Sequence, residues 1–175
     1  NGAAIFTPAG STVFTRVEFG TVEFIDVEND GDADVVISGK QEDGTALTML
    51  YLNDGTGNYN ADANSNFVQL AGGTVVDVAD IDNDGDFDIL MSGATDGFNI
   101  HTILYINDGL GKFTELVSAD LQNTFAGTNS IADMDNDGDL DIVIIGSQAG
   151  GLPNIYNIVY ENLSNNVFSP IDTIG

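Results

Sequence analysis

The chain of 175 residues lacks cysteine and tryptophan and holds only three basic residues. Without cysteine there are no disulfides, no thiolate metal sites and no cysteine nucleophile. Three Lys or Arg against 28 Asp or Glu give a formal net charge of -25, which argues against binding to nucleic acid or anionic lipid. No apolar run approaches the roughly 18 residues of a membrane-spanning helix, and the opening residues do not predict a signal peptide.

The acidic residues are concentrated in three segments, which we call the acidic windows: residues 26–34 (DVENDGDAD), 80–88 (DIDNDGDFD) and 133–141 (DMDNDGDLD). Each window has an acid at positions 1, 3, 5, 7 and 9 and glycine at position 6. The acids are Asp26, Glu28, Asp30, Asp32, Asp34, Asp80, Asp82, Asp84, Asp86, Asp88, Asp133, Asp135, Asp137, Asp139 and Asp141. No Lys or Arg lies in a window, so an external cation is needed to neutralise these loops.

The windows belong to an internal repeat, because they begin 54 and 53 residues apart. A short strand is expected before each window, at 21–25, 74–79 and 128–132, and a buried strand after it, at 35–39, 89–93 and 142–146. A third and a fourth strand are expected within 49–59, 103–113 and 158–168, the first two around an Asn-Asp-Gly turn. No segment shows a sustained helical period, and 21 glycines interrupt the chain. Four strands per repeat predict an all-β fold of β-propeller type, with three four-stranded antiparallel blades.

The expected blades are residues 11–66, 67–120 and 121–175, in one repeat array. Phe6-Thr7-Pro8 and Phe168-Ser169-Pro170 lie at the same phase of the repeat, so residues 1–10 are expected to form an outer strand that completes a neighbouring blade. Three blades leave two open flanks, and propellers usually have four to eight blades. We therefore expect self-association through blade edges, as a dimer or a filament, or further blades in a longer chain.

Oxygen ligands at alternate positions around a glycine turn are typical of calcium sites, where six to eight oxygens surround the ion. Each window therefore predicts one Ca²⁺ site, with the fifteen acids as candidate ligands. By analogy with the known calcium loop, position 7 offers its backbone carbonyl and position 9 closes the site. Position 12 is Ile37, Met91 or Ile144 instead of glutamate, which excludes the helix-loop-helix calcium hand.

Three features of the chain point to one repeat family: the window pattern, the spacing of 54 and 53 residues between windows, and the segments LYLNDGTGNY and LYINDGLGKF. In these three features the chain resembles the FG-GAP/VCBS repeat family. These repeats form calcium-bearing blades in the propeller of the integrin α-subunit and in many secreted bacterial proteins. The resemblance implies calcium in the hairpin between the first two strands of each blade. It differs from the family pattern at Glu28, where aspartate is usual, and in the third repeat, which lacks the Asn-Asp-Gly turn.

No catalytic motif is present, and the paired carboxylates are expected to be metal ligands rather than glycosidase acids. His101 is interpreted as an ordinary strand residue, and Tyr51, Tyr105 and Tyr160 as blade-packing residues at matching positions. The expected function is that of an extracellular, calcium-stabilised scaffold for adhesion or interaction, not an enzyme, with a protein or glycan as ligand. The alternative is a propeller appendage of a larger secreted carbohydrate-active enzyme or lectin.

Overall fold

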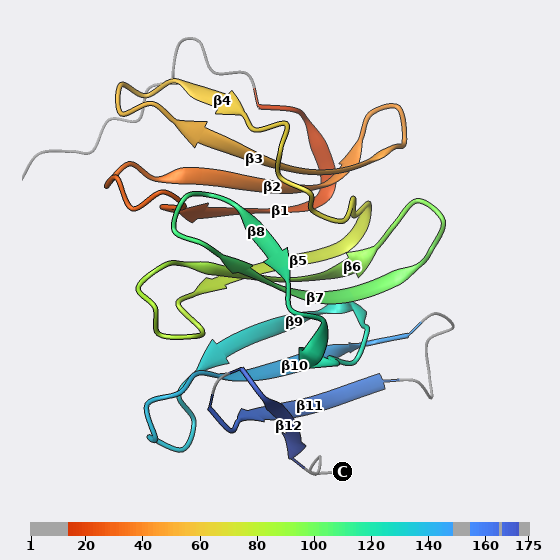
Figure 1. Ribbon diagram of the computed structural model, residues 1–175. Helices are drawn as coiled ribbons and strands as arrows, with labels where there is room; N and C mark the ends of the chain where they lie inside the picture. Colours follow the sequence, from red (N-terminus) through yellow and green to blue (C-terminus); the bar gives the residue numbers. More distant parts are fainter. Residues whose placement is uncertain (1–13, 149–154, 165, 172–175) are drawn as a thin grey trace, which may run out of the picture.

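The structure, a computed structural model, describes residues 14–148, 155–164 and 166–171. These residues form three four-stranded antiparallel sheets, in each of which the strands are paired in chain order (Figure 1). The first sheet consists of β1 (Val17–Ile25), β2 (Asp34–Gln41), β3 (Ala46–Asn53) and β4 (Tyr59–Ala61). The second consists of β5 (Gly72–Ala79), β6 (Asp88–Ala94), β7 (Ile100–Asn107) and β8 (Phe113–Glu115). The third consists of β9 (Phe125–Ala132), β10 (Asp141–Ser147), β11 (Ile155–Asn162) and β12 (Phe168–Ile171).

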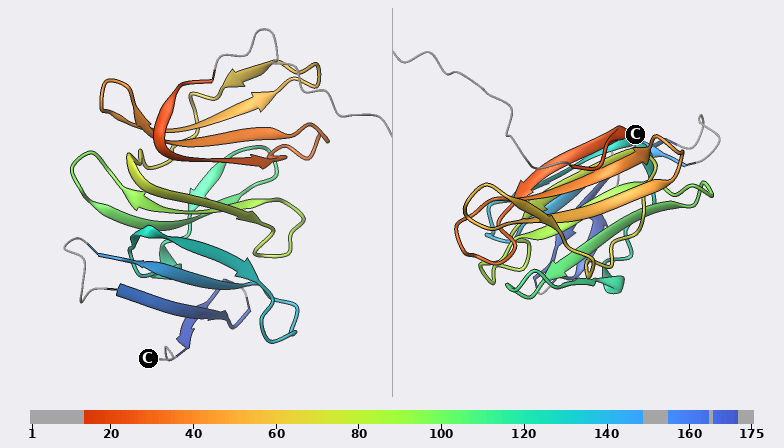
Figure 2. Two further views of the ribbon diagram at one scale, coloured as in Figure 1. Left: turned by 180° about the vertical axis from the view of Figure 1, so that it is seen from behind. Right: turned by 90° about the horizontal axis from the view of Figure 1, so that it is seen from above.

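The three sheets are stacked as successive blades, with β5 lying against both β1 and β9 (Figures 1 and 2). This arrangement confirms the predicted all-β fold of propeller type with three four-stranded blades. One element was not expected: the 3₁₀ helix η1 (Val117–Ala119) in the connection from β8 to β9. The strand expected at residues 1–10 lies outside the described residues. Within the described ranges, no helix has the length and apolar character needed to cross a membrane.

The hydrophobic core fills the two seams between blades. Val36 and Leu50 of the first blade pack against Ile89 and Met91 of the second. In the second seam, Leu90 and Leu104 pack against a matching set from the third blade, Ile142, Ile144 and Tyr160. Successive side chains of a strand point to opposite faces, so β6 sends Ile89 and Met91 to one seam and Leu90 to the other. Because β6 is covered on both faces, its whole length is buried.

The connections divide the array into two ends. The β1–β2, β5–β6 and β9–β10 loops contain the acidic windows, and the β3–β4 and β7–β8 turns lie at the same end because all strands are antiparallel. We call this the acidic end. The β2–β3 and β6–β7 connections lie at the opposite end, which we call the hairpin end, as the ribbon in Figure 1 also shows.

Candidate metal centres

Each acidic window folds into the same tight loop between the first and second strands of its blade. The backbone takes a positive φ at position 4 and again at glycine 6: 59° at Asn83 and 96° at Gly85 in the second window. The first and third windows repeat this, with 54° and 90° at Asn29 and Gly31 and 65° and 98° at Asn136 and Gly138. A Cβ on Gly85 would meet nothing within 4 Å, so the backbone conformation, not space, requires glycine there.

The aspartate at position 9 joins the window to the end of the third strand. In the second window, Asp88 Oδ2 accepts the Ile81 N–H at 3.0 Å and Asp88 Oδ1 accepts the Asn107 N–H at 2.9 Å. Asp34 and Asp141 make the same pair of bonds in their blades. Asp88 is 1% exposed, and this burial, opposed by the two N–H donors, raises its pKa to about 7. Position 9, expected as a metal ligand, therefore also fixes the loop to the sheet, which the sequence did not predict.

In the second and third windows the side chains at positions 1, 3 and 5 accept backbone N–H groups of their own loop, and in the first window those at positions 1 and 5 do. In the second window, Asp80 Oδ2 accepts from Gly85 at 3.1 Å, and Asp84 Oδ1 accepts from Asp86 at 2.9 Å. Burial, with the charge of Asp84, raises the pKa of Asp82. Asp80 Oδ1 is buried and has no hydrogen-bond partner. A buried, unpaired carboxylate oxygen is costly, and a cation at this point would remove that cost.

In two windows the carboxylates at positions 1, 3 and 9 converge. One oxygen from each of Asp80, Asp82 and Asp88 lies within 4.8 Å of the others, and Asp133, Asp135 and Asp141 do the same. Among the described residues, Asp26, Glu28 and Asp34 of the first window form no such group. Partial burial and the charge of Asp34 raise the pKa of Glu28. The window that has the longer glutamate side chain at position 3 is thus the window whose carboxylates do not converge.

The side chain at position 7 lies against the Asn-Asp-Gly turn of its own blade, a contact that the sequence did not predict. A Cβ on Gly55 would lie 2.5 Å from Asp32 Oδ2, and Gly109 is similarly close to Asp86. These turns therefore require glycine because the window approaches them closely. The observation fits the expectation that position 7 offers its backbone carbonyl, since its side chain is directed to the turn.

Asparagines connect neighbouring blades at the acidic end, and these residues were also missed. Asn29 Nδ2 donates to Asp86 Oδ1 of the next window, and Asn83 Nδ2 donates to the Gly138 carbonyl at 3.4 Å. Asn107 Nδ2 donates to the Val27 carbonyl at 3.0 Å, while its buried Oδ1 has no partner. The sequence signals are the recurrence of asparagine at position 4 of every window and, for Asn107, its place in an Asn-Asp-Gly turn.

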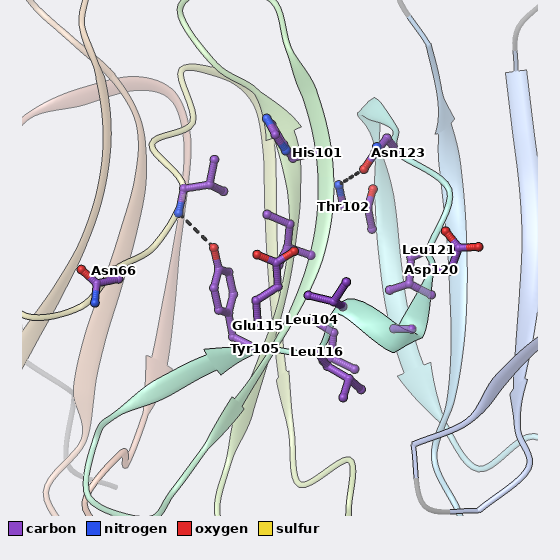
Figure 3. A pocket seen from close by; sticks show the side chains of 14 residues that line it. Asn66, His101, Thr102, Leu104, Tyr105, Glu115, Leu116, Asp120, Leu121 and Asn123 are labelled. Carbon is purple, nitrogen blue, oxygen red and sulfur yellow. Dashed lines mark hydrogen bonds between the residues drawn. The ribbon is translucent and has the colours of Figure 1, made fainter.

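The remaining candidates have packing roles or line a polar pocket. Tyr51, Tyr105 and Tyr160 are each 5% exposed, and each hydroxyl accepts a backbone N–H from the segment before a blade, such as that of Val68 on Tyr105 at 3.1 Å. His101 lines a pocket of about 480 Å³ beside β7, together with Glu115 (Figure 3). The side chain of His101 has no hydrogen bond within the part of the chain that the structure describes.

Asp77 on β5 provides a prediction about pH. Burial, with the nearby charge of Glu23 on β1, raises the pKa of Asp77 to about 6, and its Oδ2 is buried without a partner. A carboxyl with a raised folded-state pKa stabilises the fold below its unfolded pKa, and this contribution is lost as the pH rises through the folded value. At saturating calcium, we expect Asp77→Asn to be more stable than wild type at pH 7.5 by about 1–2 kcal/mol, allowing for partial exposure, and equal to it near pH 4.

Urea unfolding at both pH values tests this, with Glu18→Gln on the exposed part of β1 as the control. An equal effect of Asp77→Asn at the two pH values would contradict the assignment.

Comparisons with known proteins agree with this geometry. Residues 26–91, which contain the first two windows, match the model of the FG-GAP-like repeat. The search of curated proteins found no match. Among solved structures, one described as the structural basis of specific recognition of non-reducing terminal N-acetylglucosamine by an Agrocybe aegerita lectin is similar, with a TM-score of 0.57 and 21% identity. The match covers 87% of this chain and 37% of the other.

At this identity the likeness concerns the fold alone, and the chain spans little more than a third of the length of that structure. The repeat match independently covers two windows whose loops have the same backbone conformation. Within this all-β array of three propeller-type blades, residues 26–91 therefore match the FG-GAP-like repeat.

Proposed function

We propose that the chain is an extracellular, calcium-binding propeller module that acts as a non-enzymatic scaffold for adhesion or interaction. The observation that carries the proposal is the convergence of Asp80, Asp82 and Asp88 around a buried Asp80 Oδ1 that has no hydrogen-bond partner. The same loop occurs three times, in a chain with a formal net charge of -25. Neutralisation by a bound cation explains both facts.

The chemistry of the donors favours calcium. The windows offer oxygen atoms only, and a hard cation with six to eight oxygen ligands suits such a set. In the second window, Asp80, Asp82, Asp84 and Asp88 would hold the ion with the position 7 carbonyl. The hydrogen bonds of Asp88 leave it lone pairs for a ligand, because each carboxylate oxygen can accept more than once. Bound calcium supplies positive charge that holds the hairpin closed, and extracellular calcium modules bind the ion with a Kd of roughly 10⁻⁴–10⁻³ M.

The position of the windows supports a structural role for the ion. They lie at one end of the array, where Asn29 and Asn83 connect each window to the next. Ordering one loop therefore supports its neighbour. A propeller appendage of a larger secreted lectin or carbohydrate-active enzyme is the second candidate, because the similar solved structure is described as a lectin that recognises N-acetylglucosamine.

Binding to a glycan array and pull-down from extracellular extracts, each with calcium and with chelator, test the proposal. We expect saturable binding in calcium that is lost in chelator and restored by adding calcium back. The control is Asp43→Asn, an acidic residue outside the windows. The scaffold role would be overturned if the chain bound no glycan or protein in calcium. Its calcium dependence would be overturned if binding were equally strong in calcium and in chelator.

The three proposed sites are expected to differ in affinity. The carboxylates of the first window do not converge, and Glu28 at position 3 is an exposed, longer side chain. We expect Asp82→Ala and Asp135→Ala each to lower the number of tightly bound calcium ions by one, while Glu28→Ala removes only a weak phase. Calorimetric titration measures both. Loss of most of the binding in Glu28→Ala, with Asp82→Ala harmless, would contradict this order.

Self-association through blade faces is also proposed. The face of the first blade that holds Val36 packs on the second blade, and the face of the second blade that holds Leu90 packs on the third. Both side chains are fully buried. The equivalent face of the third blade holds Val143, which is only partly buried, and Ile145, which is 42% exposed. On the complementary face of the first blade Val35 and Ile37 are already buried, and the partly buried Phe14, Val17, Met49 and Tyr59 that pack against them would meet a partner. Because the two faces differ, the contact is head to tail. Repeating this contact gives a closed ring if the rotation between copies closes, and an open filament if it does not.

We expect light scattering to show concentration-dependent assembly in calcium, and Ile145→Lys to prevent it. Lys112→Glu, a charge change in the β7–β8 turn, is the control. A chain that stays a monomer of 18.4 kDa at high concentration would refute the proposed contact.

A further inference from the structure

A pocket at the hairpin end lies far from the acidic windows and has a different character. Its volume is about 250 Å³, and it lies where the three blades meet. Lys40 and Gly44 of the first blade, the β6–β7 turn of the second and Phe125 of the third line it. The floor is formed by the small residues Ala71, Gly72, Gly73 and Ala94.

The β6–β7 turn carries an aromatic residue where the fold favours glycine. In both hairpins the first turn residue donates to the last: Gln41 to the Thr45 carbonyl, and Thr95 to the Asn99 carbonyl. The fourth residue of the turn is Gly44 in the first blade, with φ of 90°, and Phe98 in the second, with φ of 61°. A left-handed backbone costs a non-glycine residue about 1–2 kcal/mol.

The packing of Phe98 accounts for only part of that cost. Its ring meets Phe125 edge to face with centroids 6.0 Å apart, a contact of about 0.5–1.5 kcal/mol. Yet Phe98 remains 66% exposed, so most of its apolar surface stays in water. An exposed aromatic residue on a strained backbone is typical of a binding site, where strain is retained for function.

The polar groups of the pocket define a ligand. Lys40 is one of three basic residues in the chain and forms no ion pair within the described ranges, so its ammonium is available to an anion. Asp96 Oδ2 accepts the Ala46 N–H at 2.9 Å, which leaves Oδ1 to accept a hydroxyl. A Cβ on Gly72 would meet nothing within 4 Å, so there is free space beside Gly72, whereas Gly73 is packed closely against Ala126. The pocket thus combines an aromatic ring, one cation, one hydroxyl acceptor and room for a single ring.

We propose that this pocket binds a hexuronic acid residue of a glycan. The apolar face of the sugar would stack on Phe98, its carboxylate would pair with Lys40, and its hydroxyls would donate to Asp96. The inference rests on the proposed function as an interaction module and names its ligand class. It places the site at the end opposite to the calcium loops, so calcium would support the fold without touching the sugar.

Calorimetric titration of the calcium-loaded full chain with methyl glucuronoside and with galacturonic acid oligomers tests the proposal, and methyl glucoside and galactose oligomers are the neutral probes. We expect saturable binding of the uronates and at least tenfold weaker binding of the neutral sugars. Phe98→Gly restores the residue that the first blade uses, so it should fold at least as stably as wild type and bind at least tenfold more weakly. Lys40→Gln and Gly72→Leu should weaken binding similarly.

Lys112→Gln, a cation at the acidic end, is the control and should bind as wild type does. Uronates also chelate calcium, so binding that survives in Phe98→Gly and Lys40→Gln would locate the sugar at the windows and overturn the proposal. Equal binding of neutral sugars, or no binding of uronates, would overturn it too. If other glycans still bind in calcium on the array, the scaffold function stands and only this ligand assignment fails.

Discussion

Excess chelator is expected to lower the melting temperature of the calcium-loaded chain by roughly 10–20 °C. A ligand that binds only the folded state stabilises it by about 2.7 kcal/mol per site at a hundredfold excess over Kd, so the two tighter sites contribute about 5 kcal/mol and the weaker first site adds less. In a domain of this size each kcal/mol corresponds to about 2–4 °C. The effect is large because fifteen window acids have no basic partner within the windows. Without the cation, their mutual repulsion favours the unfolded chain.

Scanning calorimetry or circular dichroism measures this shift. Chelator already saturated with calcium is the control for effects of the chelator itself, and magnesium at the same concentration tests the preference for the larger ion. High salt without calcium should recover only a small part of the loss, because screening weakens repulsion but supplies no ligand bonds. A melting curve that does not change in chelator would contradict the calcium assignment for all three windows.

The periodic part of this structure could be predicted from the sequence because its determinants are local. The apolar run after each window predicts a buried strand, and Gly31, Gly85 and Gly138 predict the sharp loop. The alternation of acids predicts that the side chains at positions 1, 3 and 5 turn inward and that position 9 closes the site. In the second and third windows the structure brings the carboxylates at positions 1, 3 and 9 within 4.8 Å of one another.

The remaining features depend on contacts between segments far apart in the chain. Asn107 is 80 residues from Val27, whose carbonyl it bonds, and no local pattern indicates that pairing. The contact of Asp86 with Gly109 follows from how the strands of the second blade pair. The position of Phe98 beside Lys40 follows from how the blades stack. Phe98 also violates a local rule, since a turn that favours glycine holds an aromatic residue. Sequence reasoning from propensity is weakest at such positions.

Replacing the position 9 aspartate is expected to destabilise the fold apart from any metal. Asp88→Ala leaves the N–H groups of Ile81 and Asn107 without their acceptor, and a buried unpaired donor costs about 1–3 kcal/mol. The expected loss is therefore about 2–6 kcal/mol, with a further loss of calcium binding. Asp84→Ala is the matched control, because exposed Asp84 accepts a single loop N–H and has no bond to the sheet.

Urea unfolding over a range of calcium concentrations separates the two contributions. The metal contribution grows with the logarithm of the calcium concentration, whereas the hydrogen bonds of Asp88 contribute equally at every concentration. Both variants should show a smaller rise of stability with calcium than wild type, since each lacks one proposed ligand. Only Asp88→Ala should also be shifted downward by a constant amount. If the two variants gave the same curve, position 9 would act through the metal alone, and the pairing of its oxygens with Ile81 and Asn107 would carry no stability of its own.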